Sequence, residues 1–209
     1  MRRASLLPFI ACLALASCSS KAPAPTPAPT VAVTAGDIGN GVLMAADMGA
    51  GWAAVKNPQP DTFQIGGKIG AATYLKDARH AQTVSFTQTN GSGYVTNTVY
   101  VLPNVADAQA VMSAHTGQPT TWRQQRTDGG YLDATNTGPV SGLEQLGDDS
   151  YSAHVDATVK PGTSTQTTKR IVEYVAYRIG NVMSFVVAQD VGVSAFARRQ
   201  EARLQRAIP

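Results

Sequence analysis

The chain has 209 residues, of which 43% are hydrophobic and only 15% charged, with a formal net charge of +3 at neutral pH. Loss of Arg2 and Arg3 with a cleaved leader lowers that charge to +1, so a nucleic-acid partner is not expected. Both cysteines, Cys12 and Cys18, lie near the start, so the rest of the chain has neither a disulfide nor a cysteine metal site.

The first residues have the features of an export signal. A positive start precedes an apolar run over residues 6–16, about half of the ~20 residues that a membrane-spanning helix needs. The run ends in Leu15-Ala16-Ser17-Cys18, which resembles the lipobox of bacterial lipoproteins. The resemblance implies that residues 1–17 are removed as a lipoprotein signal peptide. It also implies that Cys18 receives a diacylglycerol on its sulfur and an acyl chain such as palmitate on its amine.

Two alternatives to this leader stay open. Residues 1–17 could be an ordinary signal peptide that leaves a free thiol at Cys18. The arginine pair leaves twin-arginine export open beside the general secretory route.

Residues 18–36 are predicted to form a lipidated tether. Two or three acyl chains anchor a protein stably without a spanning helix, so we expect attachment to the extracytoplasmic face of the cell membrane. Proline occupies positions 23, 25, 27 and 29. This alternation excludes a helix and favours an extended spacer of ~3.1 Å per residue. The folded domain is predicted to span residues 37–209.

The domain's patterns predict short helices and antiparallel strands. In the first half we expect a helix over 37–48 capped by Thr34, a strand over 71–75, hairpin strands over 83–89 and 94–102, a helix from Asn104 to His115, and an edge strand over 120–126. In the second half we expect a strand over 131–137, a loop over 138–149, strands over 151–159, 170–179 and 182–188, and a last helix capped by Ser194.

Antiparallel hairpins dominate this order, and no βαβ repeat is present. The order predicts an α+β domain with a single antiparallel curved sheet and helices packed on one face. The turn at Gly180-Asn181 joins the last two strands, and the nearly all-apolar strand over 182–188 is expected at the centre of the sheet. Glu173 shares a face of its strand with Val175 and Ile179, where a carboxylate is unexpected.

Four short stretches carry a further resemblance. They are AADMGAGW at 45–52, NVADA at 104–108, LGDDS at 146–150 and RIGNV at 178–182. With the layout of residues 37–208, they resemble actinobacterial envelope lipoproteins and the extracellular sensor domains of mycobacterial receptor Ser/Thr kinases. The resemblance implies an envelope module for ligand binding or sensing, and it implies no enzyme activity.

The sequence has no pattern typical of catalysis or metal binding. The three histidines, His80, His115 and His154, lack a His-x-x-x-His spacing, and no Gly-x-Ser-x-Gly elbow occurs. We therefore expect no cofactor, no metal and no enzyme activity. An envelope hydrolase would need a serine or carboxylate within hydrogen-bond reach of a histidine in a cleft, and we expect none.

Aromatic residues are better candidates for a binding site. Rings on the faces of a sheet often line an apolar pocket, although the core is the commoner place for any one of them. The candidate ligand-binding residues are Trp52, Tyr74, Trp122, Tyr174 and Tyr177. The arginine-rich side of the last helix is either a solvated face or a contact with anionic lipid head groups.

The sequence as a whole favours a membrane-anchored envelope lipoprotein that is not an enzyme. We expect it to bind a small apolar or amphipathic ligand, or an envelope partner protein, between its sheet and helices. The alternative is a scaffolding lipoprotein that uses a flat sheet face, and an envelope hydrolase is less favoured. A closed apolar cavity of several hundred Å³ would separate the first function from the second.

Overall fold

The computed structural model describes residues 32–57, 78–116, 120–126 and 128–209. Cys18, the leader, most of the tether, the strand expected over 71–75 and the candidate Tyr74 lie outside these residues. Within them, no helix is both long enough and apolar enough to cross a membrane.

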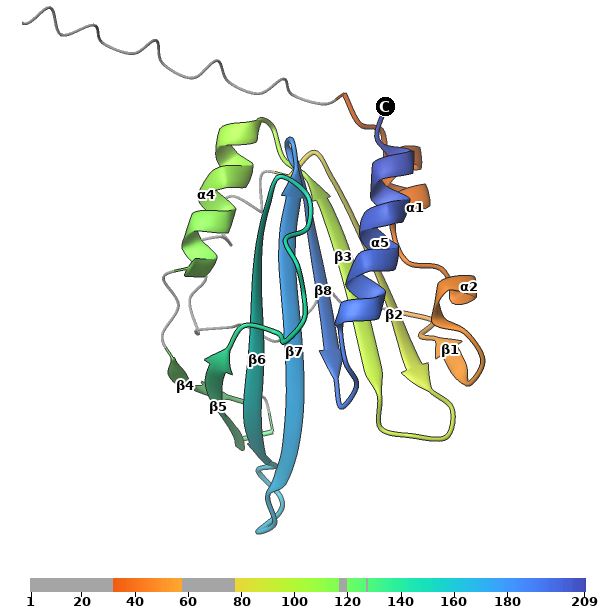
Figure 1. Cartoon of the computed structure of the whole chain (residues 1–209). Coiled ribbons are helices and arrows are strands. Elements are labelled where there is room, and N and C mark those ends of the chain that lie inside the picture. The colour runs from red at the N-terminus through yellow and green to blue at the C-terminus, as the bar shows by residue number, and fades with distance from the viewer. Residues whose placement is uncertain (1–31, 58–77, 117–119, 127) are drawn as a thin grey trace, which may run out of the picture.

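One antiparallel sheet of eight strands forms the body of the domain, in the order β1-β2-β3-β8-β7-β6-β5-β4 (Figure 1). The strands are β1 Trp52–Ala54, β2 His80–Gln88, β3 Tyr94–Val101, β4 Thr121–Gln125, β5 Tyr131–Gly138, β6 Asp149–Lys160, β7 Thr168–Ile179 and β8 Val182–Gln189. The α+β class, the single antiparallel sheet, the edge position of β4 and the central position of β8 are thereby confirmed.

The helices are α1 Ala35–Gly41, α2 Ala45–Met48, α4 Val105–Thr116 and α5 Ser194–Ala207. Thr34 caps α1 as predicted, because its hydroxyl oxygen accepts from the Asp37 N–H at 3.3 Å while the Asp37 carboxylate accepts from the Thr34 N–H at 2.8 Å. Residues 35 and 36, assigned above to the tether, are therefore helical. Asn104 likewise precedes α4, and its side-chain oxygen accepts from the Asp107 N–H at 2.8 Å.

The continuous helix predicted over 37–48 is wrong, because α1 ends at Gly41 and α2 begins only at Ala45. Val42 between them has extended backbone angles. The N–H of the buried Leu43 donates to the side-chain oxygen of Asn97 on β3, at 3.1 Å. The hydrogen bond to the sheet and the burial of two apolar side chains stabilise this extended segment more than a continuous helix would be stabilised by its apolar spacing.

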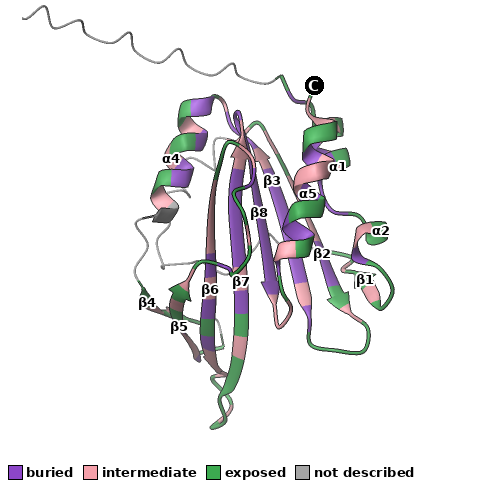
Figure 2. Cartoon of the chain, viewed as in Figure 1, coloured by how far each residue is buried: buried purple, intermediate pink, exposed green. Residues whose placement is uncertain are grey.

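Helices lie on both faces of the sheet, so the prediction that they share one face is wrong. Successive side chains of a strand point to opposite faces. On β7, Val175 and Tyr177 belong to the core formed with α1 and α5, whereas Tyr174 and Ala176 belong to the core formed with α4. Figure 1 shows α4 beside β6 and α5 on the side of β3, and Figure 2 shows the buried residues concentrated on β3, β8 and β7.

A buried polar cluster fastens α5 to the sheet. The side-chain oxygen of Gln200, a fully buried residue, accepts from the hydroxyls of Tyr177 and Ser184, the latter at 2.7 Å. The side-chain nitrogen of Gln200 donates to the Gly41 carbonyl at 3.1 Å. Burial raises the pKa of the Tyr177 hydroxyl well above its ordinary value, so the hydroxyl keeps its hydrogen. Because these buried groups satisfy one another, the cluster holds α1, α5, β7 and β8 together.

The start of α5 is held by a residue of the sheet. Ser194, the predicted cap, does not cap the helix: Val193 is at the N-cap position, with no side-chain cap bond. The Glu173 carboxylate accepts from the Val193 N–H at 2.7 Å. An acidic group stabilises a helix N-terminus, and this bond explains a carboxylate among apolar residues of β7.

Candidate ligand-binding site

The candidate site begins where β5 ends. The pairing of β5 with β6 shifts between Asn136 and Gly138, and Gly138 has a φ of 133°, which favours glycine. The Asn136 side-chain oxygen accepts from the Gly138 N–H at 3.0 Å, and its nitrogen donates to the Tyr151 hydroxyl at 3.1 Å. Burial raises the pKa of Tyr151. The irregular end of β5 therefore positions a neutral tyrosine of β6.

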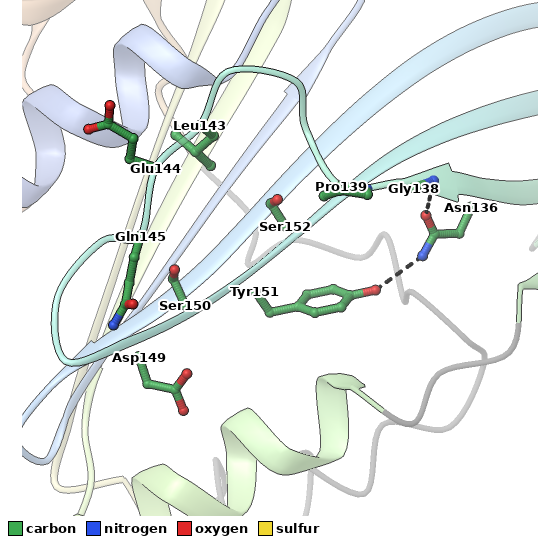
Figure 3. Close-up of a pocket in the computed structure, with 10 residues that line it drawn as sticks. All are labelled: Asn136, Gly138, Pro139, Leu143, Glu144, Gln145, Asp149, Ser150, Tyr151 and Ser152. Carbon is green, nitrogen blue, oxygen red and sulfur yellow. Dashed lines mark hydrogen bonds between the residues drawn. The ribbon is translucent and has the colours of Figure 1, made fainter.

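The loop over residues 139–148 is folded back against β6, as Figure 3 shows. Two serines of β6 hold it: Ser152 Oγ accepts from the Val140 N–H at 3.1 Å, and Ser150 Oγ accepts from the Leu146 N–H at 3.2 Å. Val140 and Leu146 are buried in the core on the α5 side. The loop is thus a fixed wall, and among the described residues neither serine hydroxyl donates its own hydrogen to a partner.

Helix α5 supports this loop from the other side. The Glu201 carboxylate accepts from the Gly147 N–H at 2.6 Å, and the Arg198 guanidinium donates to the Gly142 carbonyl at 3.2 Å. Gly147 has a φ of 55°, and a Cβ there would lie 2.2 Å from the Arg178 carbonyl oxygen. Only glycine fits this close approach.

A hollow of about 500 Å³ lies between the loop and β6. It is lined by Asn136, Gly138, Pro139, Leu143, Glu144, Gln145, Asp149, Ser150, Tyr151 and Ser152 (Figure 3). Pro139, Leu143 and the Tyr151 ring supply apolar surface, while hydroxyl, amide and two carboxylate groups supply the rest. The lining suits a ligand that is partly apolar, forms hydrogen bonds and is neutral or cationic. The hollow is open and mixed in character, so it is not the closed apolar cavity that would favour ligand binding over scaffolding.

The Tyr151 ring ends a row of aromatic side chains on the α4 side of the sheet. The ring centroids of Tyr151 and Tyr174 are 6.4 Å apart, those of Tyr174 and Phe185 are 6.1 Å apart, and those of Phe185 and Tyr100 are 5.7 Å apart. Such contacts stabilise aromatic pairs beyond the area that they bury. The row therefore connects the wall of the hollow to the core of β7, β8 and β3.

The four predicted aromatic residues that the structure describes do not meet in one place. Trp52 packs edge-on against Phe196, with 5.5 Å between ring centroids, in the same core as Tyr177. Trp122 and Tyr174 pack in the core on the opposite face. Among these four, Tyr174 adjoins the hollow through its contact with Tyr151.

Sequence reasoning missed Tyr151 and Asn136 as site residues. Their signal was weak: Tyr151 fitted an alternating strand, and Asn136 preceded a Gly-Pro step. Only the bulge between β5 and β6 shows that the two side chains meet.

One histidine has a carboxylate partner, although not in a cleft. The His154 ring nitrogen Nδ1 lies 3.1 Å from a Glu173 carboxylate oxygen, so a carboxylate is within hydrogen-bond reach of a histidine. The other Glu173 oxygen holds the start of α5 at Val193. The pair lies between β6 and β7 and lines none of the hollows described here. It therefore gives no support to a hydrolase.

The arginines on α5 mainly contact other parts of the domain. The Arg199 guanidinium donates to the Asp47 carbonyl, and Arg203 donates to the Val42 carbonyl at 3.0 Å and to the Asp47 carboxylate at 3.3 Å. These bonds fasten α2 and the segment before it to α5. Arg203 is paired with the Asp47 carboxylate, whereas Arg199 and Arg206 remain exposed.

Acidic and histidine side chains do not gather into a metal site anywhere in the described part of the chain. No protein-family model matches the sequence, and no curated protein matches it either.

The fold, by contrast, is shared with an extracellular domain of known structure. That domain is the extracellular domain of PknH from Mycobacterium tuberculosis, with a TM-score of 0.52 at 11% sequence identity. The similarity covers 84% of this chain and 96% of that one. The resemblance to a mycobacterial receptor-kinase extracellular domain is therefore confirmed at the level of the fold.

Proposed function

We propose that this chain is a lipid-anchored binding domain on the extracytoplasmic face of the cell membrane, and that it is not an enzyme. Its ligand is small and amphipathic, and it binds in the hollow beside Tyr151. The observation that carries the proposal is the hollow itself, whose lining combines apolar surface with hydrogen-bonding groups. The leader pattern ending at Cys18 supports the location, and the shared fold of an extracellular domain agrees with it.

The anchor is tested separately from the binding site. The full chain and its Cys18→Ala variant are expressed in a bacterium that processes lipoproteins, and the cells are fractionated. The native chain is expected in the membrane pellet, and the variant is expected in the extracytoplasmic soluble fraction. A variant that stays in the pellet as completely as the native chain contradicts lipid anchoring at Cys18.

The hollow is tested by filling it. Gln145 is an exposed lining residue, and Gln145→Trp places an indole in the space that the ligand needs. Gln166→Trp makes the same substitution at an exposed position outside the hollow and serves as the control. The probe is N-phenyl-1-naphthylamine, a neutral molecule whose fluorescence rises in apolar surroundings.

We expect saturable fluorescence with the native chain and with Gln166→Trp, and a loss of about tenfold in affinity with Gln145→Trp. Mass spectrometry of small molecules extracted from the purified chain then identifies the natural ligand. If the two tryptophan variants bind the probe equally well and nothing is extracted, the scaffolding function replaces the binding function.

A further inference from the structure

A second hollow, of about 550 Å³, lies where β7 extends beyond the end of β8. It is lined by Asp133, Thr135, Asp156, Ala157, Thr158, Lys169, Arg170, Ile171 and Asp190. Its floor is formed by β5, β6 and the first residues of β7. Thr135, Asp156, Lys169 and Ile171 are exposed there, so this end of the sheet carries accessible side chains.

Most charges around the second hollow are already neutralised within the protein. The Arg123 guanidinium donates two hydrogen bonds to the Asp133 carboxylate, at 2.5 and 2.7 Å, and lowers the pKa of Asp133. Arg170 donates to Asp190 at 2.7 Å. Asp190 has a φ of 58° and accepts from the Ile171 N–H at 3.2 Å, so its position in the wall is fixed from two sides.

One carboxylate and one ammonium group are left over. The Asp156 side chain is 65% exposed, and its nearest ion-pair partner, the His154 ring, is 4.0 Å away. Lys169 is exposed and forms no ion pair within the described part of the chain. Strand pairing sets Asp156 opposite Ile171 and Thr158 opposite Lys169. The Asp156 carboxylate and the Lys169 ammonium, which do not pair with each other, therefore lie at diagonal corners of a four-residue square.

Ile171 gives the square an apolar corner. It is 47% exposed, and Met44 is the other large apolar residue classed as exposed in the described part. The remaining corner, Thr158, offers a hydroxyl group. An acceptor, a cationic donor, a hydroxyl and an apolar surface thus lie within one hollow.

We infer that this second hollow binds a free apolar amino acid, such as leucine, in its zwitterionic form. The ligand's ammonium group contacts the Asp156 carboxylate, its carboxylate contacts the Lys169 ammonium, and its side chain covers Ile171. A ligand with both charges satisfies both corners at once, whereas a singly charged ligand leaves one corner unpaired. This site is distinct from the hollow beside Tyr151 and does not depend on its function.

The inference is tested by calorimetric titration of the purified full chain with leucine and three analogues. N-acetyl-leucine lacks the ammonium group, leucinamide lacks the carboxylate, and glycine lacks the apolar side chain. We expect leucine to bind with a Kd of about 1 mM or tighter, and each analogue to bind about tenfold more weakly.

Variants that remove one charge each test which ligand group contacts Asp156 and which contacts Lys169. Asp156→Asn and Lys169→Gln are each expected to weaken leucine binding about tenfold. Asp156→Asn should leave N-acetyl-leucine binding unchanged, because that analogue has no ammonium group to lose. The matched control is Lys56→Gln, another exposed lysine that lines neither hollow; it should bind leucine like the native chain.

Three results would each overturn the inference. One is an absence of binding heat at about 10 mM leucine, a concentration tenfold above the weakest expected Kd. Another is equal binding of leucine and its analogues. The third is an equal loss of affinity in the control variant Lys56→Gln. Because the substituted side chains are exposed, thermal unfolding of every variant should match that of the native chain, which separates lost binding from lost folding.

Discussion

Replacing Gln200 by methionine tests the buried cluster that holds α5. Methionine nearly preserves the length and volume of glutamine but removes its amide. The hydroxyls of Tyr177 and Ser184 then lose their acceptor, and the Gly41 carbonyl loses its donor. Each buried polar group left without a partner costs about 1–3 kcal/mol, and the gain from burying a thioether offsets only part of this. We expect a net loss of about 3 kcal/mol in the free energy of unfolding.

The assay is urea unfolding of the purified chain, followed by circular dichroism. For a domain of this size, the loss corresponds to a fall of about 6–12 °C in Tm. Gln205→Met is the matched control on the same helix, because Gln205 is exposed and, among the described residues, its side chain donates only to a Glu201 carboxylate oxygen, at 3.3 Å. It should change stability by less than about 0.5 kcal/mol. A loss below about 1 kcal/mol in Gln200→Met would refute the view that the cluster is mutually satisfied and buried.

Three further predictions concern titration and helix ends. Burial raises the pKa of Tyr177 in the folded state, so its contribution to stability is complete below the unfolded value of about 10 and declines above it, by about 1.4 kcal/mol per pH unit. Tyr177→Phe should remove that part of the decrease in the free energy of unfolding with pH. Urea unfolding of both proteins between pH 9 and about 11.5 would contradict this if the native chain and the variant lost stability equally with rising pH. Glu173→Ala should cost about 1–2 kcal/mol through loss of the bond to Val193, and Glu173→Gln should cost less; equal urea midpoints for the two variants would count against it. Thr34→Ala should cost about 1 kcal/mol in the same assay, and an unchanged midpoint would mean that the cap does not stabilise the domain.

Local patterns predicted the elements whose structure depends on neighbouring residues. The alternation in β2 and β3 matches their pairing, and Asn104 begins α4 because its side chain reaches an N–H three residues away. The Gly180-Asn181 turn joins β7 and β8 as expected, with Gly180 at a φ of 57°. In each case the responsible contact lies within a few residues or within one hairpin.

Contacts between distant residues explain the errors. The bond from Leu43 to Asn97 joins residues 54 apart, so the sequence near Leu43 does not reveal that the helix stops there. An apolar stripe shows that α4 packs against something, but not which face of the sheet it covers. Glu173 holds the N-cap residue of α5, which lies 20 residues further along the chain, and Asn136 reaches Tyr151 only because the strands pair with a bulge. The candidate site was therefore the least predictable part of the domain.

Helix α5 is linked by hydrogen bonds to the sheet and to residues beside both hollows. Its buried side is fixed to the sheet through Gln200, and its start is held by Glu173, which also contacts His154 beside the second hollow. Glu201, further along the same helix, holds Gly147 in the wall of the first hollow. A displacement of the loop over residues 139–148 must break or carry along these bonds. Only a movement that keeps the bond to Glu201 carries α5 with it, and the end of α5 lies beside the first described residues of the chain (Figure 1).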